Sequence, residues 1–284
     1  MQVLITGADG RIGRMLRVAW ADAKPAQFQP VWSARRGFHP TDMLWDIDTD
    51  NAPPIAKGAV ILHLAGLVRG TADSLKSNAS MALKVCAAAK IAGARHVFLA
   101  SSSAVYGASP DVLVEVRAPA PRSDYGRAKL DMERSALCWA QNAGPDAPGV
   151  TCLRIGNVLG ADTLFGKRQS GQDFILDPVP GSALGPLRSY IGPQFFAQVI
   201  ACLLERVVQG GCLPPILNIA ARGPVFMADL LSAGEVPFRF GPANADVIPK
   251  VQLSTKRLAD FVTLPKVDAG TLVADWRSVM GRAA

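Results

Sequence analysis

The feature that most constrains the fold is an apolar strand that runs directly into three evenly spaced glycines. Residues 2–6 read QVLIT, and residues 6–13 read TGADGRIG, with glycines at positions 7, 10 and 13. Such a turn directs backbone N–H groups and the positive end of the next helix at a pyrophosphate. The spacing is GxxGxxG, whereas the usual dinucleotide fingerprint is GxGxxG. Because the glycines follow an N-terminal strand, a dinucleotide site explains them better than a simple tight turn.

Strand-like and helical segments alternate through the first part of the chain. Apolar runs occupy residues 2–6, 28–33, 59–64, 96–101 and 149–155, and helical periodicity covers 11–23, 73–93 and 124–144. Gly93 and Gly144 are expected helix stops. The alternation predicts an α/β fold of the Rossmann type, a doubly wound parallel sheet with helices on both faces.

The pattern loosens after about residue 160 into stretches rich in glycine and proline, such as DPVPGSALGPL and GGCLPP. We therefore predict a Rossmann domain over residues 1–160 and a smaller C-terminal substrate-binding lobe over 161–284, from which some elements return to the first domain.

Charge, cysteines and histidines narrow the class of protein. The formal net charge is +7 and the basic residues are scattered, which favours an anionic small molecule over nucleic acid. The five cysteines include no close CxxC pair, which is typical of reduced thiols in a cytoplasmic protein. The three histidines are far apart, so we expect no metal site.

Neither a secretion signal nor a membrane span is expected. The chain opens with MQVLIT and reaches the glycines at once, which leaves no room for a signal peptide. The longest apolar stretch, FFAQVIACLLERVV, is interrupted by Glu205 and Arg206, short of the roughly 20 residues that a span requires. We expect a soluble, cytoplasmic protein.

The segment SDYGRAK places Tyr125 four residues before Lys129. On a helix this spacing puts both side chains on one face, where they can reach the same ligand. The plain alternative is a half-buried ring beside a solvated ammonium on an ordinary helix surface.

Together with these patterns, four further segments in order make the chain resemble the extended short-chain dehydrogenase/reductase family, which includes nucleotide-sugar epimerases and dehydratases. In LWDI, Asp46 and Ile47 resemble the acidic-apolar pair that lies beside adenine in this family, and HLAG (63–66) resembles the loop beneath the cofactor. SSSAVYG (101–107) resembles the segment that carries the catalytic serine or threonine, and RIGNVLG (154–160) resembles the link to the substrate lobe.

The resemblance implies specific roles. Lys129 would hydrogen-bond the nicotinamide ribose and favour the phenolate, Ser102 would orient the substrate oxygen, and Tyr125 would exchange a proton as hydride moves. A one-residue shift to Ser101 or Ser103 stays open. The implied cofactor contacts are Gly7, Asp9, Gly10, Arg11, Ile12, Gly13, Asp46, Ile47, Leu64, Ala65, Gly66, Asn78, Tyr125 and Lys129, and the implied substrate contacts are Ser102, Ser103, Tyr125, Asn157 and Arg188.

Arg188 carries the expectation of a nucleotide sugar. It lies in LRSYIG (187–192), similar to the family's R-D-Y/F-I/V-H-V stretch, whose arginine grips the substrate diphosphate. A planar guanidinium suits that task because it pairs two phosphate oxygens. Ser189 stands where aspartate is common, and Arg239 is a weak candidate for the second arginine. A free sugar, a uronate or another small carbonyl compound remains an alternative substrate, and Arg188 on a solvated surface is the plain alternative.

The reaction type is partly constrained. A 4,6-dehydratase of this family carries an Asp-Glu pair where this chain has Ser103 and Ala104. The acid/base pair that would catalyse the elimination of water is therefore missing. Epimerase and simple dehydrogenase or reductase are both left open. A regulatory protein that senses NAD(P) without turnover is a further alternative, against which the intact Ser102, Tyr125 and Lys129 argue.

The second strand predicts the cofactor. It ends in SARRGF, without a carboxylate to accept bonds from the adenosine ribose. Ser33, Arg35 and Arg36 offer a hydroxyl and two guanidinium groups to a 2′-phosphate, which favours NADP over NAD, although Asp42 or Asp46 can approach from the neighbouring strand.

The helices expected over residues 73–93 and 124–144 carry apolar residues on more than one face. Pairing these helices between two subunits would bury the apolar residues that one sheet cannot cover. We therefore expect a homodimer; packing of both faces within one subunit is the alternative. The residues concerned are Leu83, Val85, Met132, Leu137 and Trp139.

Overall fold

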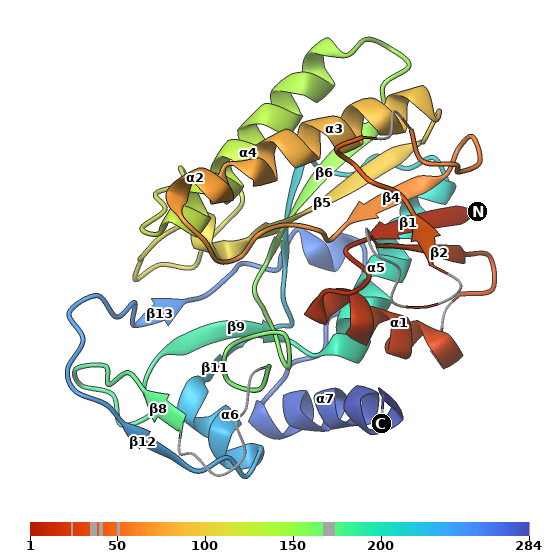
Figure 1. The fold of residues 1–284 in the computed structure, drawn as a ribbon. Helices are drawn as coiled ribbons and strands as arrows, with labels where there is room; N and C mark the ends of the chain where they lie inside the picture. The colour runs from red at the N-terminus through yellow and green to blue at the C-terminus, as the bar shows by residue number, and fades with distance from the viewer. Residues whose placement is uncertain (24, 35–38, 40–41, 50–51, 167–173, 284) are drawn as a thin grey trace.

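The protein is built around one parallel sheet. The computed structural model describes residues 1–23, 25–34, 39, 42–49, 52–166 and 174–283. The 7-stranded sheet has the order β10-β6-β5-β4-β1-β2-β3 (Figure 1), and its neighbouring strands pair in parallel. The strands are β1 (Gln2–Thr6), β2 (Gln29–Ala34), β3 (Met43–Leu44), β4 (Val60–His63), β5 (His96–Ser102), β6 (Gly149–Ile155) and β10 (Ile216–Ile219).

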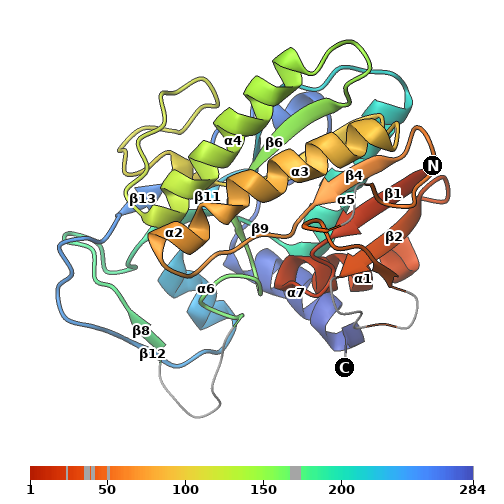
Figure 2. The same ribbon diagram turned by 45° about the horizontal axis from the view of Figure 1, so that its top comes forward.

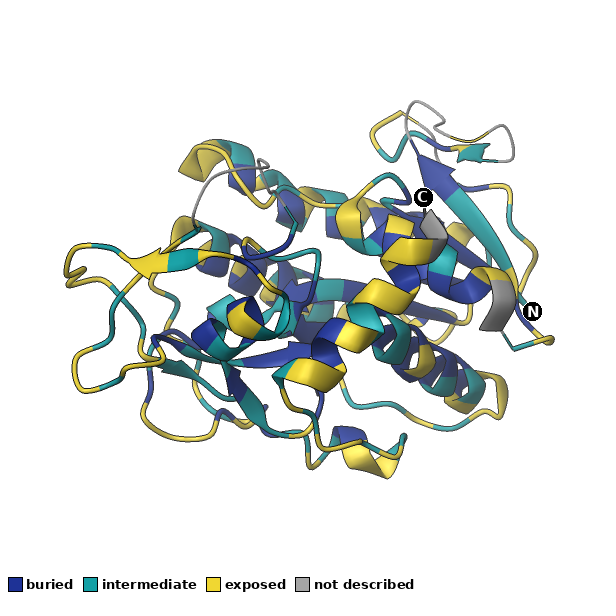
Figure 3. Cartoon of the chain, turned by 90° about the horizontal axis from the view of Figure 1, so that it is seen from below, coloured by how far each residue is buried: buried dark blue, intermediate teal, exposed yellow. Residues whose placement is uncertain are grey.

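The central strands are apolar on both faces because each face meets a layer of helices. In β1, Val3 and Ile5 enter one core while Leu4 enters the other, as the two-residue period of a strand requires. Figure 3 shows that the buried residues follow the strands and the inward faces of the helices, while exposed residues lie on outer helix faces and loops.

Helices cover the two faces of the sheet as a doubly wound fold requires. One layer contains α1 (Arg11–Ala23), α5 (Pro193–Val208) and α7 (Ala269–Ala283), and the other contains α3 (Ser77–Ile91) and α4 (Asp124–Asn142), preceded by the short α2 (Ala72–Leu75) (Figures 1 and 2). The predicted Rossmann-type fold class is confirmed.

Two elements from the second half of the chain complete this domain. β10 pairs with β6, with Ile216 opposite Cys152, and α5 packs against α1. The start of α5 is capped from α7: the Asp275 carboxylate accepts hydrogen bonds from Gln194 N at 2.7 Å and Phe195 N at 3.1 Å.

The five strands expected from the sequence all occur, within one or two residues at their ends. The expected helices occur too, with the second divided into α2 and α3. Gly93 and Gly144 follow the ends of α3 and α4 with φ of 65° and 84°, a left-handed conformation that glycine adopts without strain. β3 and β10 were not expected.

The remaining elements form a smaller group beside the sheet with its own core. β9 is central to it, because β7, β11 and β13 all pair with it, while β8 and β12 form a separate ribbon. The bounds are β7 (Asn157–Val158), β8 (Phe174–Leu176), β9 (Leu187–Ile191), β11 (Pro224–Phe226), α6 (Met227–Ala233), β12 (Phe238–Phe240) and β13 (Lys250–Val251); the 3-10 turns are η1 (Ser103–Val105) and η2 (Leu258–Asp260).

Within the described part of the chain, no helix has both the length and the apolar character needed to cross a bilayer. All five cysteines are free thiols.

Candidate active site

The glycine turn joins β1 to α1 and packs directly on the loop after β4. Gly7 has φ of 71°, and a Cβ there would lie 2.6 Å from Ala65 N. A Cβ at Gly13 would lie 2.4 Å from the Gly7 carbonyl oxygen. Both positions therefore require glycine, and the backbone of the turn lies directly at the start of α1. A backbone cradle at a helix N-terminus fits the diphosphate of a dinucleotide.

A cavity of about 610 Å³ begins at this turn and extends to β9. It is bounded by the turn, the loop after β4, the end of β5, the start of α4 and the smaller lobe. Twelve of the residues singled out in the sequence line it: Gly7, Gly10, Arg11, Ile12, Gly13, Leu64, Gly66, Ser102, Tyr125, Lys129, Asn157 and Arg188.

Ser102, Tyr125 and Lys129 meet inside the cavity. Ser123 caps α4 by accepting from Gly126 N, which places Tyr125 in the first turn of the helix. Ser102 ends β5, and its side chain hydrogen-bonds to the Tyr125 phenol. Of the adjacent serines, Ser101 also lines the cavity, but its hydroxyl donates to Glu133 Oε1 at 2.5 Å. Ser103 begins η1 and does not line the cavity.

Burial sets the electrostatics of the two titratable groups. It raises the pKa of the Tyr125 phenol, and the hydrogen bond with Ser102 opposes that effect. Burial also lowers the pKa of Lys129 to about 8, although the nearby Glu133 carboxylate favours the charged form of the lysine. Lys129 Nζ donates to the Ala100 carbonyl at 2.8 Å and lies 6.0 Å from the centre of the Tyr125 ring.

The loop after β4 is held from two sides. The Asn78 amide accepts from Leu67 N and donates to Leu67 O, each at 3.0 Å, so Asn78 fixes the loop rather than lining the cavity. His63 Nδ1 lies 2.7 Å from Thr6 Oγ1, and burial lowers the pKa of His63 to about 3. His63 is thus a neutral link between β4 and β1.

The residues that the sequence assigns to the adenosine end of a bound cofactor lie only partly within the described residues. Ser33 is only 2% exposed, and Arg35 and Arg36 lie outside the described residues. Asp46 Oδ1 accepts from Asp48 N, and Asp42 forms an ion pair with Arg17 at 2.5 Å. Asp46 and three more residues of the expected set, Asp9, Ile47 and Ala65, do not line the cavity.

On the substrate side, Arg188 projects from β9. Its guanidinium donates to the carbonyls of Leu187 at 2.9 Å, Pro249 at 3.3 Å and Ile248 at 2.6 Å. Burial lowers its pKa. Arg239 is exposed on β12 and does not line the cavity.

Asp162 and Tyr190 also line the cavity and were not singled out in the sequence. Asp162 Oδ2 and Tyr190 Oη are both buried, and the two side chains interact with each other. Burial raises the pKa of Asp162 to about 6. Asp162 lies two residues after RIGNVLG, and Tyr190 lies within LRSYIG, two residues after Arg188.

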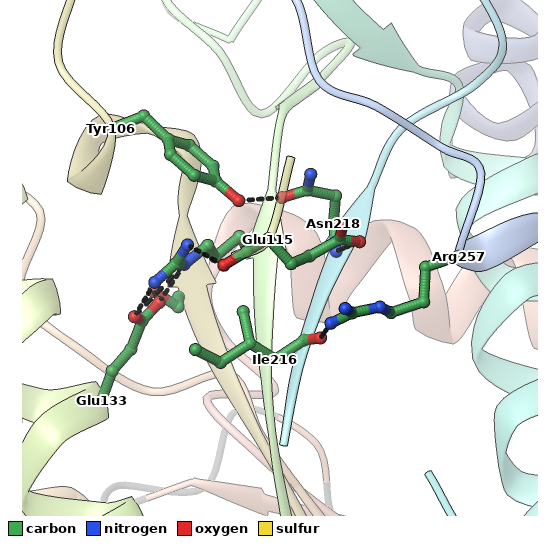
Figure 4. A network of polar contacts seen from close by, with 8 residues as sticks. Tyr106, Glu115, Glu133, Ile216, Asn218 and Arg257 are labelled. Carbon is green, nitrogen blue, oxygen red and sulfur yellow. Dashed lines mark hydrogen bonds and ion pairs between the residues drawn. The ribbon is translucent and has the colours of Figure 1, made fainter. Parts of the chain in front are cut away.

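Figure 4 shows a buried polar network that includes Glu133, which lies on α4 four residues after Lys129. Arg154 on β6 donates to Glu133 on α4 through Nε at 3.0 Å and Nη2 at 2.7 Å, and both side chains are 2% exposed. Tyr106 donates to Asn218 Oδ1 at 2.7 Å, and Glu115 accepts from Asn218 N at 3.1 Å. The network joins α4, β6 and β10.

Comparison with known proteins gives one family and many similar structures. A family model described as "NAD dependent epimerase/dehydratase family" matches residues 3–174, whereas no curated protein matches. Chain coverage is 100% on both sides for MoeE5 in complex with UDP-glucuronic acid and NAD, which is 21% identical with a TM-score of 0.78. It is also 100% on both sides for the Stenotrophomonas maltophila UDP-glucose-4-epimerase with bound NAD and formylated UDP-arabinopyranose, at 21% identity and a TM-score of 0.77. The UDP-N-acetylglucosamine 4-epimerase from Methanobrevibacter ruminantium M1 in complex with UDP-N-acetylmuramic acid is 17% identical, with a TM-score of 0.74 and 98% of each chain covered.

Proposed function

Because the chain belongs to the NAD dependent epimerase/dehydratase family, enzymes of the extended short-chain dehydrogenase/reductase type, we propose that it modifies a nucleotide sugar by hydride and proton transfer. The observation that carries this proposal is the single cavity that contains the glycine turn, Ser102, Tyr125 and Lys129.

The proposed roles follow from the positions of these groups. Tyr125 exchanges a proton with a sugar hydroxyl, and Ser102 holds the substrate oxygen beside the phenol. Lys129 donates to the ribose of the cofactor and favours the ionised phenol. A bound nicotinamide ring would accept and return the hydride.

The proposal of a nucleoside-diphosphate sugar rests on Arg188, Asn157 and the ligands bound in the similar structures. Arg188 lines the cavity beyond Tyr125, and the similar proteins include complexes with UDP-glucuronic acid and UDP-glucose. The guanidinium has five N–H donors, and its three hydrogen bonds to backbone carbonyls leave Nε and one Nη2 hydrogen for the oxygens of such a ligand.

We propose epimerisation as the reaction, with net oxidation or reduction as the alternative. An epimerase regenerates its cofactor in each cycle and benefits from holding it, whereas a dehydrogenase must exchange it. The test is to identify any nucleotide that survives purification, and then to assay UDP-sugars and free uronates with and without added cofactor. Turnover of a UDP-sugar without added cofactor supports the proposal, and turnover of free sugars alone contradicts it.

The lowered pKa of Lys129 predicts a pH limit on cofactor affinity. With a pKa of about 8, Lys129 carries its charge below this pH and loses it above. A charge-assisted hydrogen bond contributes about 1.5–3 kcal/mol, so we expect NAD affinity to fall about tenfold as pH rises from about 7 to 9. Tryptophan fluorescence titrations check this. In Lys129→Arg, which stays charged, the affinity should not follow pH; a flat wild-type profile would contradict the assignment.

We propose NAD as the cofactor, although the sequence favours NADP. The family description and the similar structures name NAD, and the low exposure of Ser33 argues against its contact with a 2′-phosphate. We expect NAD to bind more tightly than NADP, as measured by calorimetry on the wild type and Arg35→Ala. Tighter NADP binding that Arg35→Ala removes would restore the arginine interpretation.

We also propose a homodimer in the cytoplasm. The five free thiols support a reducing compartment. Val85 and Met132 are buried within the subunit, and Leu137 and Trp139 pack partly on the same core, so the surface left for a partner is narrower than the sequence suggests. Light scattering at micromolar concentration should give twice the monomer mass; a monomer would contradict the dimer.

A further inference from the structure

The titratable groups closest to Lys129 are mostly uncharged at neutral pH. On β4, burial and the Lys129 charge lower the pKa of His63 to about 3. On β6, burial raises the pKa of the Cys152 thiol well above its usual value. On α4 itself, burial raises the pKa of Tyr125. Of these three groups only Cys152 would favour the charge of Lys129, and it would do so only as a thiolate, a form that its raised pKa disfavours.

Glu133 is different because its carboxylate is built into the wall behind Lys129. The two residues are four apart on α4, which places them on one face of the helix. The Glu133 carboxylate acts against the burial of Lys129 by favouring its charged form.

The position of this carboxylate is fixed by two strands. The Ser101 hydroxyl on β5 donates to Oε1 at 2.5 Å, while Arg154 on β6 donates to both oxygens of Glu133. Ser101 and Arg154 pair in register, so the carboxylate is held from two adjacent strand positions. Arg154 is the second charged group of this wall, and its charge is opposite to that of Glu133.

We propose that Glu133 is a positioning residue for Lys129: its carboxylate, held by Ser101 and Arg154, keeps the lysine charged and in place against Ala100 at the cavity. The inference rests on the role given to Lys129 in the proposed function. It gives a second role to the Glu133–Arg154 ion pair, which otherwise only joins α4 to β6.

A purely structural pair and a positioning pair predict different results when Glu133 loses its charge. In Glu133→Gln the side chain keeps its size, but Lys129 loses its nearby anion and still faces Arg154. An opposite charge at close range typically shifts a pKa by about 1–3 units, so the Lys129 titration should move to lower pH by at least about one unit. A structural role alone leaves that titration where it is.

The experiment is NMR titration of the lysine side chains in the cofactor-free protein, with the Lys129 signal assigned by its loss in Lys129→Arg. We expect a wild-type midpoint near pH 8. Glu133→Gln should lower it, and Glu133→Gln combined with Arg154→Gln should recover part of the loss because the facing cation is gone. Asp131→Asn, an exposed change on the same helix, is the matched control and should leave the midpoint unchanged.

Glu133→Asp guards against a Gln variant that fails to fold. It keeps a charge for Arg154 but withdraws the carboxylate, so it should lower the midpoint by less than Glu133→Gln would. The same order should appear in the pH at which NAD affinity falls. A Lys129 midpoint that is unchanged in the folded variants overturns the inference. Failure of the wild type to bind NAD would instead contradict the proposed function, while the titration of the cofactor-free protein still decides the role of Glu133.

Discussion

Tyr125→Phe is expected to reduce turnover by about 10²–10⁴-fold while leaving cofactor affinity nearly unchanged. The substitution removes the hydroxyl that exchanges the proton and keeps the ring that packs in the cavity. The measurement is the turnover rate on the best nucleotide sugar, together with NAD affinity from calorimetry. Turnover within a few-fold of wild type would remove Tyr125 from the chemistry.

Tyr106→Phe is the matched control, because the Tyr106 hydroxyl donates to Asn218 within the buried network and does not line the cavity. Its loss leaves the Asn218 oxygen without that donor, at a cost of about 1–3 kcal/mol in the free energy of unfolding. We expect Tyr106→Phe to be less stable but active, and Tyr125→Phe to be stable but inactive. The same result for both would show that turnover depends on packing in this region rather than on a particular hydroxyl.

Glu133→Ala is expected to lower the free energy of unfolding by about 3–5 kcal/mol. The substitution leaves the Arg154 guanidinium, which is 2% exposed, without its counter-charge. For a chain of this size the melting temperature should fall by roughly 5–8 °C. Differential scanning calorimetry and urea unfolding measure the effect.

Lys84→Ala provides the comparison for that result. Lys84 forms an ion pair with Asp48 at 2.7 Å, but the two side chains are 48% and 61% exposed. Water screens such a pair, so its removal should cost about 0–1 kcal/mol. Equal losses from Glu133→Ala and Lys84→Ala would mean that the Glu133–Arg154 pair contributes no more than a surface ion pair.

The sequence predicts the first part of the fold well because the signals there are local. QVLIT and AVILHL are apolar on both faces, as strands covered by two helix layers must be, and Gly93 and Gly144 mark helix ends. β10 was missed because ILNI is only four residues long between loop segments, and its pairing with β6 is a contact across some 60 residues of chain. β3, with two residues, carries no periodic signal.

The candidate site shows the same division. Ser102, Tyr125 and Lys129 belong to motifs with fixed spacing, and all three line the cavity. Glu133 and Arg154 were overlooked because a charged residue on a helix and one in a strand carry no sign of their partnership until α4 packs on β6. The sequence also could not predict that Ser33 is buried, because serine at a strand end is common at both buried and exposed positions.

The cap of α5 by Asp275 has a consequence for biosynthesis. Residues 194 and 275 are separated by 81 positions, so the ribosome releases α5 long before the side chain that caps it. Until then the N–H groups of Gln194 and Phe195 lack the carboxylate that accepts from them in the folded protein. The cap of α5 is therefore completed only after the segment that carries Asp275 has emerged.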